Sequence, residues 1–471
     1  MTVPDWVQDA IFYQIFPDRF ANGDAAADPF NVQPWGSLPQ LRGFQGGDLE
    51  GVIQKLDYLH TLGINAIYLN PIFQAASNHR YDTYDYFKID PKLGDLEAFK
   101  RLLTVAHGLG IRVILDGVFN HCGRGFFAFQ DILENETDSP YLKWFHVKGF
   151  PLNAYGDGPP PNYECWWQNK SLPKFNTNEP AARKYLLDVS RYWIEQGADG
   201  WRLDVPNEIN DEEFWAEFRS LVKGVNPHAY TLGEIWDVNP RWVGPHSFDG
   251  LMNYPFRAAV IDFFGKNSIS ASQFGSTVTH LLTVYPREHV YAQFNPLGSH
   301  DTERTLMMCG GDVARMKMTL LFQFTYVGAP SIYYGDEIGL TGGKDPDCRR
   351  AFIWDESKWN TDLWNYVKSL VAIRKAHPAL RRGEYRQLYH HDREGLFAFL
   401  RKHDQHERDA VIVVFNNSDT PVIRNIPATH SGWQNGMWAR DLLTGKKFVV
   451  ENHFVTNLRL PPRTGMILAT Q

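Results

Sequence analysis

The chain has 471 residues, a net charge of −7 from 47 basic and 54 acidic side chains, and four widely spaced cysteines. This length exceeds what one hydrophobic core usually serves, so we expect two or three domains. The balanced charge, the lack of a membrane-length apolar stretch and the cysteine spacing argue against nucleic-acid partners, membrane partners and a disulfide framework. The first residues lack the pattern of a secretory signal, which predicts a cytoplasmic location.

Apolar runs of strand length alternate with amphipathic segments of helical length through most of the chain. Such alternation, repeated eight times, is typical of a (β/α)8 TIM barrel, an α/β fold whose chemistry lies at the carboxyl ends of the strands. The expected strands are 11–16, 66–70, 112–118, 200–205, 230–235, 250–254, 291–295 and 331–334. The expected helices are 49–63, 95–110, 180–197, 211–225 and 364–377.

Two regions depart from this alternation. After the third strand comes a long stretch rich in Gly, Pro, Asn and aromatic residues, and an insertion of this length in a compact domain is usually functional. After Pro378 the pattern changes to short β-like runs, which predicts a small antiparallel domain. The predicted division is a barrel from 1–120 and 180–382, an insertion from 121–179 and an antiparallel β-sandwich from 383–471.

Acidic residues stand where several of these apolar runs end. Asp204 ends the segment that begins at Gly200, and Glu234 ends the next run about thirty residues later. Cleavage of a sugar acetal needs one acid that protonates the leaving oxygen and one ionised carboxylate at the anomeric carbon. Two carboxylates at successive strand ends therefore indicate glycosidic-bond chemistry.

Four segments in order carry a family resemblance. They are DGVFNH at 116–121, GWRLDVPNE at 200–208, GEIW at 233–236 and GSHD at 298–301. Their order, spacing and separation by helical segments resemble the signature segments of the α-amylase family, glycoside hydrolase family 13. The resemblance implies a barrel with a domain B inserted after the third strand, a C-terminal sandwich, and retaining hydrolysis of α-glucosidic bonds.

The resemblance also implies residue roles. Asp204 matches the nucleophile, Glu234 the acid/base, and Asp301 the third carboxylate, which grips sugar hydroxyls. Arg202 is expected to keep Asp204 ionised by lowering its pKa, and Trp236 to favour protonated Glu234 by desolvation. Asp116 is expected to orient Arg202 from below, with a purely structural role as the alternative. The remaining substrate contacts implied by the family are Tyr81, His121, His300, Glu208, Asp345 and Arg349.

Substrate preference rests on fewer residues. The segment LPKFN at 172–176 resembles the MPKLN form shared by cyclomaltodextrinases, neopullulanases and maltogenic amylases. It departs from that form at Leu172 and Phe175, and Pro206 stands where the group commonly has Ala. The barrel begins almost at residue 1, so the N-terminal domain typical of that group is missing from this sequence. Cyclodextrins, pullulan, starch and linear maltooligosaccharides all remain open as substrates, as does the oligomeric state.

A turn near the N-terminus predicts a calcium site. Asn22, Asp24 and Asp28, followed by Gly46 and Asp48, supply oxygen ligands at short spacing with a turn that glycine permits, as Ca²⁺ prefers. It resembles the calcium loop of neopullulanase-type proteins. The alternative is a solvated acidic turn.

Three other functions are alternatives to a hydrolase. The same three acids serve a transglycosylase or a sucrose- or trehalose-type isomerase, which only product analysis separates from a hydrolase. A non-catalytic carbohydrate-binding protein would be expected to have lost one of the acids. A metal-dependent hydrolase would need a histidine cluster at the strand ends, and the two histidines here lack that spacing.

Overall fold

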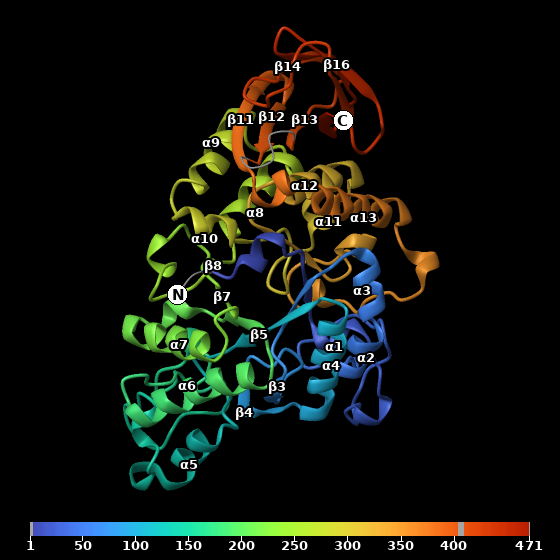
Figure 1. Ribbon diagram of the computed structural model, residues 1–471. Coiled ribbons are helices and arrows are strands. Elements are labelled where there is room, and N and C mark those ends of the chain that lie inside the picture. Colours follow the sequence, from blue (N-terminus) through green and yellow to red (C-terminus); the bar gives the residue numbers. More distant parts are fainter. Residues whose placement is uncertain (1–2, 404–408, 471) are drawn as a thin grey trace.

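The computed structural model describes residues 3–403 and 409–470. Eight parallel strands lie at its centre in the order β8-β7-β6-β5-β2-β1-β10-β9 (Figure 1). A parallel bridge between Met252 and Phe294 joins the two ends of this sheet. The predicted TIM barrel is therefore confirmed. Its strands are β1 (Phe12–Ile15), β2 (Ala66–Leu69), β5 (Arg112–Gly117), β6 (Gly200–Leu203), β7 (Tyr230–Gly233), β8 (Gly250–Leu251), β9 (Phe294–Pro296) and β10 (Ala329–Tyr333).

Helices cover the outside of the barrel, and several of them begin at capping side chains. The carboxylate of Asp95 accepts from the N–H of Ala98, and that of Asp211 from Phe214, which satisfies N–H groups in the first turns of α4 and α7. The helices are α1 (Pro17–Phe20), α2 (Leu49–Gln54), α3 (Leu56–Leu62), α4 (Leu96–Gly108), α5 (Phe127–Asn135), α6 (Pro180–Glu195), α7 (Glu212–Val225), α8 (Tyr254–Val260), α9 (Ala271–Leu281), α10 (Arg287–Tyr291), α11 (Thr305–Met308), α12 (Val313–Thr325), α13 (Thr361–Ala376) and α14 (Pro378–Arg382).

Both faces of the barrel strands are buried. In β2, Ala66 and Tyr68 pack in the barrel interior, while Ile67 and Leu69 pack in the layer between strands and helices. A parallel strand covered on both sides reads as an unbroken apolar run. This explains why short apolar runs, rather than alternating ones, marked the strands in the sequence.

Three predicted elements need correction. The predicted strand 291–295 is in part helical, because α10 extends to Tyr291 and β9 begins at Phe294. The predicted strand 250–254 ends at Leu251, and the side chain of Asn253 caps α8 by accepting from Phe256 at 3.2 Å. The predicted helix 49–63 is divided into α2 and α3 at Lys55. Periodicity does not separate a short apolar strand from a short buried helix, which accounts for the first two errors.

The C-terminal part is an eight-stranded antiparallel sheet in the order β11-β12-β13-β18-β15-β16-β17-β14. It folds over one core, in which Leu396 and Ile412 from one half meet Ile426 and Val455 from the other. The predicted antiparallel sandwich is confirmed. Its strands are β11 (Glu384–His391), β12 (Leu396–Lys402), β13 (Ala410–Asn416), β14 (Val422–Pro427), β15 (Trp438–Asp441), β16 (Lys447–Glu451), β17 (Phe454–Leu460) and β18 (Thr464–Thr470).

Aromatic side chains join this sheet to the barrel helices. The rings of Phe274 in α9 and Phe397 in β12 lie 5.0 Å apart, and those of Phe264 and Phe415 lie 4.7 Å apart. The central strands of the C-terminal sheet are therefore buried on both faces. Figure 1 shows this sheet at one end of the molecule and α5 at the other.

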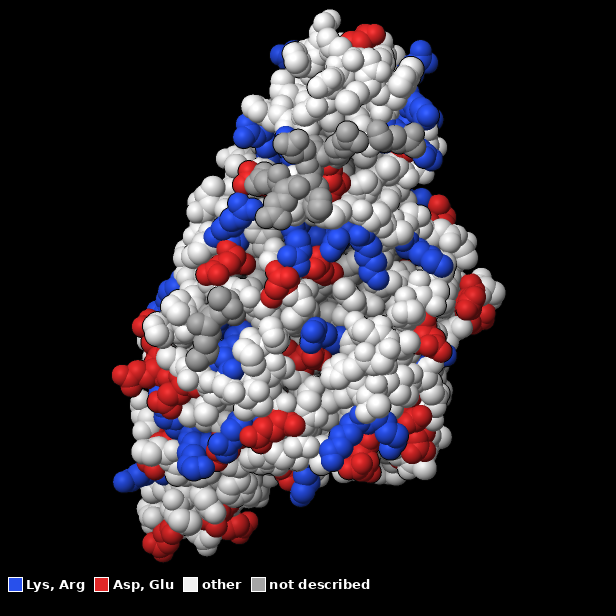
Figure 2. Space-filling view, viewed as in Figure 1, with Lys and Arg blue, Asp and Glu red and all other residues white. Residues whose placement is uncertain are grey.

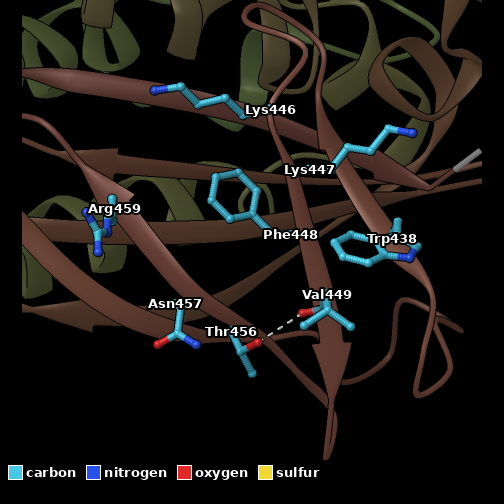
Figure 3. A pocket seen from close by; sticks show the side chains of 8 residues that line it. All are labelled: Trp438, Lys446, Lys447, Phe448, Val449, Thr456, Asn457 and Arg459. Atoms are coloured by element: carbon cyan, nitrogen blue, oxygen red, sulfur yellow. Dashed lines mark hydrogen bonds between the residues drawn. The ribbon is translucent and has the colours of Figure 1, made fainter.

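The outer face of the C-terminal sheet has a hollow of about 440 Å³ along β15, β16 and β17 (Figure 3). Its lining includes Trp438, Phe448 and Arg459. The side chain of Trp438 is 57% exposed. This gives the C-terminal domain an exposed indole that is far along the molecule from α5.

The stretch between β5 and α6 returns to the barrel rim. Isolated antiparallel bridges pair His121 with Lys174 and Cys165 with Pro173. A short antiparallel pair, β3 (Phe73–Ala75) and β4 (Thr83–Ile89), follows β2.

Within the described residues, no helix is long and apolar enough to cross a membrane. Figure 2 shows basic and acidic side chains interspersed over the face drawn.

Candidate active site

A buried guanidinium is the centre of the site. Arg202 Nη1 lies 2.8 Å from Asp116 Oδ1 and 3.0 Å from Asp204 Oδ1, and its Nη2 lies 2.8 Å from Glu234 Oε1. Asp116 and Arg202 are register partners in β5 and β6, and Asp204 and Glu234 directly follow β6 and β7. Parallel strands end at the same rim, so three neighbouring strands deliver these carboxylates to one cation.

Asp116 is held entirely by protein groups. Its Oδ1 faces Arg202, while its Oδ2 accepts from the hydroxyls of Tyr68 at 2.5 Å and Tyr81 at 2.8 Å. Its side chain has no exposed surface. A carboxylate with both oxygens occupied and no access to solvent positions Arg202 rather than reacting, which supports the orienting role inferred from the sequence.

Two rings form the floor next to Asp301. Tyr81 and His300 stack with centroids 5.3 Å apart and planes 7° apart. Nδ1 of His300 faces the side-chain amide nitrogens of Gln14 at 2.9 Å and Asn70 at 3.1 Å. Amide groups donate, so Nδ1 is the acceptor and the ring proton belongs on Nε2. That nitrogen lies 3.0 Å from Asp301 Oδ2.

Arg349 links the predicted residue Asp345 to the carboxylate of Asp301. Arg349 Nη1 lies 3.0 Å from Asp345 Oδ1, and its Nη2 lies 3.4 Å from Asp301 Oδ1. Its Nε donates to the carbonyl oxygen of His300 at 2.9 Å. These residues follow β10, on the side of Asp301 away from Glu234 in strand order. Contact of Asp345 and Arg349 with a sugar stays a prediction.

Glu234 is fixed by unusual backbone. Its Oε2 accepts from the N–H of Val205 at 3.1 Å. Val205 has φ 35° and ψ 53°, a left-handed conformation that is rare for a β-branched residue and stores strain. Strained backbone of this kind clusters at functional sites. Here its consequence is an N–H directed at one oxygen of the proposed proton donor.

The chain after Val205 leads to Glu208, in the short helix η6 (Pro206–Glu208). Nζ of Lys174 donates to the carbonyl oxygen of Glu208 at 2.8 Å. Glu208, Lys174, Trp166 and Trp167 are among the residues that line a pocket of about 420 Å³. This pocket therefore adjoins the side of the site on which Glu234 is held.

Known proteins match the whole chain. The α-amylase catalytic-domain family matches residues 14–361. The chain belongs to the α-amylase family. It is 47% identical over 470 residues to a cyclomaltodextrinase of Geobacillus thermopakistaniensis, covering 99% of this chain and 78% of that one. It is 45% identical over 471 residues to neopullulanase 2 of Thermoactinomyces vulgaris, with the same coverage.

A solved α-amylase-family structure shares the architecture. The cyclic α-maltosyl-(1→6)-maltose hydrolase of Arthrobacter globiformis superposes with a TM-score of 0.90 at 40% identity. The match covers 99% of this chain and 100% of that chain. The family resemblance of the four sequence segments is confirmed.

In this α-amylase-family site, burial has the largest effect on the pKa values of Asp204 and Glu234. Burial raises the pKa of Asp204 well above its usual range, against the lowering effect of Arg202, and the charge of Glu234 raises it further. Burial also raises the pKa of Glu234. The predicted lowering of the pKa of Asp204 by Arg202 is present, but burial outweighs it in the substrate-free site, where one guanidinium is shared among several buried carboxylates.

The surroundings of Trp236 and of the two histidines complete the description of the site. Trp236 is 46% exposed and its ring stacks on Tyr254 at 3.7 Å. Burial raises the pKa of Glu234 and the hydrogen bond of Trp236 lowers it, so desolvation of Glu234 by Trp236 stays a prediction. Burial lowers the pKa of His121 to about 3 and that of His300 well below its usual range. Both histidines are therefore neutral hydrogen-bonding groups.

The predicted calcium turn brings three of its residues together. The side-chain nitrogen of Asn22 lies 2.9 and 3.1 Å from the two carboxylate oxygens of Asp28. Gly46, at φ +85°, lies against this pair so closely that a Cβ there would be 2.3 Å from Asp28 Oδ1. Oxygen donors of the kind that Ca²⁺ prefers are thus gathered in one turn.

Asp48 has a different contact set. Its carboxylate accepts from the N–H groups of Gly23, Asp24 and Gly51, the last at 2.6 Å as the cap of α2. Among residues 3–403 and 409–470, no three His, Cys, Asp or Glu side chains converge in an arrangement that would hold a metal ion. The carboxylate of Asp24 likewise accepts from the N–H of Ala26, at 3.0 Å. Calcium binding at this turn stays a prediction.

Sequence reasoning missed Gln14, Tyr68 and Asn70. Gln14 lies within β1 and has no exposed surface, and Asn70 directly follows β2. A polar side chain inside an otherwise apolar run was the available signal, because a buried polar group needs a partner. For Gln14 and Asn70 the partner is the ring of His300, and for Tyr68 it is the carboxylate of Asp116.

Proposed function

We propose that the protein is a retaining α-glycoside hydrolase with Asp204 as nucleophile and Glu234 as general acid/base. The observation that supports this most strongly is the pairing of both carboxylates with the two terminal nitrogens of Arg202 at 3.0 and 2.8 Å. One cation then holds the attacking group and the proton donor in fixed relation, as a concerted displacement requires.

The proposed reaction has two displacements. The carboxylate of Asp204 attacks the anomeric carbon while Glu234 gives its proton to the glycosidic oxygen, so the C–O bond breaks and a glycosyl ester forms. Glu234, now ionised, takes a proton from water, whose oxygen displaces Asp204 and restores the free enzyme. Asp301, beside neutral His300, is placed to hold sugar hydroxyls more tightly as the ring flattens.

The proposed substrates are maltooligosaccharides, cyclodextrins, pullulan or starch, cleaved at α-1,4 bonds and, as a further candidate, α-1,6 bonds. Support comes from the relatives named cyclomaltodextrinase and neopullulanase and from the solved hydrolase of a cyclic sugar that contains a 1→6 bond. Transfer to a sugar acceptor uses the same acids. A cytoplasmic location is proposed because all four cysteines are free thiols.

The stereochemistry tests this proposal. Two inversions at the anomeric carbon restore its configuration, so proton NMR of the first turnovers on maltooligosaccharide should show α-configured product. A parallel product profile on cyclodextrin, pullulan, starch and maltotriose identifies the preferred substrate. Initial release of β-anomer would contradict the assignment of Asp204 as nucleophile.

We also propose that the turn of Asn22, Asp24 and Asp28, with Gly46 and Asp48, holds a structural Ca²⁺. An ion that binds only the folded state stabilises it by mass action. Exhaustive chelation should therefore lower the melting temperature and added calcium restore it, whereas Asp28→Asn should abolish this response. Asp48 is unsuitable for the test, because its loss removes the cap of α2 whether or not calcium binds. An unchanged melting temperature of the wild type after chelation would show a solvated acidic turn.

A further inference from the structure

Two adjacent tryptophans stand at the tip of a hairpin in the inserted stretch. Trp166 and Trp167 belong to the short helix η5 (Trp166–Gln168). The N–H of Trp166 donates to the carbonyl of Leu172 at 3.0 Å, and the return strand donates from Phe175 to the carbonyl of Asn120 at 3.0 Å. The hairpin is thus fastened to Asn120, three residues after the end of β5 and next to His121.

Trp167 is exposed to solvent and has a strained backbone conformation. The side chain of Trp167 is 80% exposed, so its large apolar surface remains in water. Trp167 and Gln168 both have positive φ, 46° and 59°, a conformation that side-chain-bearing residues rarely adopt. Neither burial nor backbone preference therefore explains a tryptophan at this position. Strain and exposure together indicate a function for the ring.

The ring continues a stack that starts in the active site. The planes of Trp166 and Trp167 differ by 5° at a centroid distance of 4.7 Å, and Trp166 stacks on His121 at 5.6 Å and 26°. The flat faces therefore run from His121, which is buried, to Trp167 in solvent. Trp166 is stacked on both sides, so the ring of Trp167 is the member of the stack that is exposed and able to meet the apolar face of a sugar ring.

The position of the stack identifies which part of the substrate it meets. The pocket beside the two tryptophans is also lined by Glu208 and Lys174. Glu208 lies three residues after Val205, whose N–H holds Glu234. Glu234 faces the leaving oxygen in the proposed reaction, so this pocket lies on the leaving-group side. Asp345 and Arg349 lie beyond Asp301, on the other side.

We propose that Trp167 is a specificity-determining residue that stacks on a glucosyl unit of the leaving group and thereby favours long leaving groups over short ones. This inference rests on the proposed hydrolase function. The same ring holds an incoming sugar acceptor when transfer replaces hydrolysis, because the acceptor occupies the place that the leaving group vacates.

The test compares Trp167→Asn and Trp167→Phe with a control at another exposed indole. Asn tolerates positive φ, so Trp167→Asn removes the ring without adding backbone strain. Trp438→Asn removes the indole in the hollow of Figure 3, in the C-terminal domain. Each protein is assayed on maltoheptaose and on an aryl maltoside, whose leaving group is a single ring. Maltoheptaose binding is also measured by calorimetry in the inactive Asp204→Asn background.

We expect Trp167→Asn to raise KM and Kd for maltoheptaose about tenfold, the change that corresponds to 1.4 kcal/mol, with kcat nearly unchanged. KM for the aryl maltoside should change less than twofold, Trp167→Phe should keep most of the affinity, and Trp438→Asn should match the wild type. An unchanged Kd for maltoheptaose, or an equal rise in KM on both substrates, would overturn the inference. An inactive wild-type protein would instead contradict the proposed function.

Discussion

Asp204→Asn is expected to lower kcat on starch by about 10⁴-fold or more, and an activated substrate should not restore it. The amide cannot form the glycosyl ester, whatever the leaving group. Glu234→Gln should also be strongly impaired on starch, because the leaving alkoxide then departs without a proton. An aryl maltoside needs no such proton, so the glycosylation step of Glu234→Gln should recover on it.

Asp301→Asn completes this comparison. An interaction that tightens only at the transition state affects kcat more than KM, so Asp301→Asn should lose kcat strongly on both substrates with a smaller change in KM. Rapid-mixing measurement of phenol release separates glycosylation from the later hydrolysis. Equal rescue of all three variants on the aryl substrate, or unimpaired turnover by Asp301→Asn, would show that the roles are wrongly assigned.

Arg202→Lys is expected to lower kcat/KM by about 10³-fold even though the charge is kept. The guanidinium meets Asp116 and Asp204 from one nitrogen and Glu234 from the other. An ammonium is a single point and does not reproduce this fork, so at least one buried carboxylate loses its partner. Loss of a partner from a buried ion pair costs about 3–5 kcal/mol, and the melting temperature should fall as well.

A second buried arginine gives the control for this loss of stability. Arg374 is fully buried, and its guanidinium donates to backbone carbonyls, among them that of Gly328 at 2.7 Å. Arg374→Lys should lower the melting temperature while kcat/KM of the remaining folded protein stays near that of the wild type. If Arg202→Lys lost no more activity than Arg374→Lys, Arg202 would be a structural residue only.

The barrel could be predicted from sequence because its strands are short, doubly buried apolar runs, and because β2, β5, β6 and β7 have a polar residue at or directly after their carboxyl ends. The same logic located Asp116, Asp204, Glu234 and Asp301 at the rim. It failed at β8, where only Gly250 and Leu251 are paired and the apolar run continues into α8. Two paired residues carry too little pattern to mark where a strand ends.

The contacts between side chains were harder to predict. The sharing of Arg202 among three carboxylates depends on strand register, which no local pattern states. The positive φ of Val205 and of Trp167 likewise contradicts local preference. Such conflicts between local preference and the folded structure are expected mainly at functional sites.

The C-terminal sheet shields aromatic side chains on the outside of the barrel from water. Phe264 and Phe274 are fully buried, and their partners Phe397 and Phe415 are on the sheet. A truncated protein that ends at α14 would expose the rings of Phe264 and Phe274 to water as a hydrophobic patch. The C-terminal domain therefore covers hydrophobic surface of the catalytic domain that would otherwise be exposed. We expect the catalytic domain alone to aggregate.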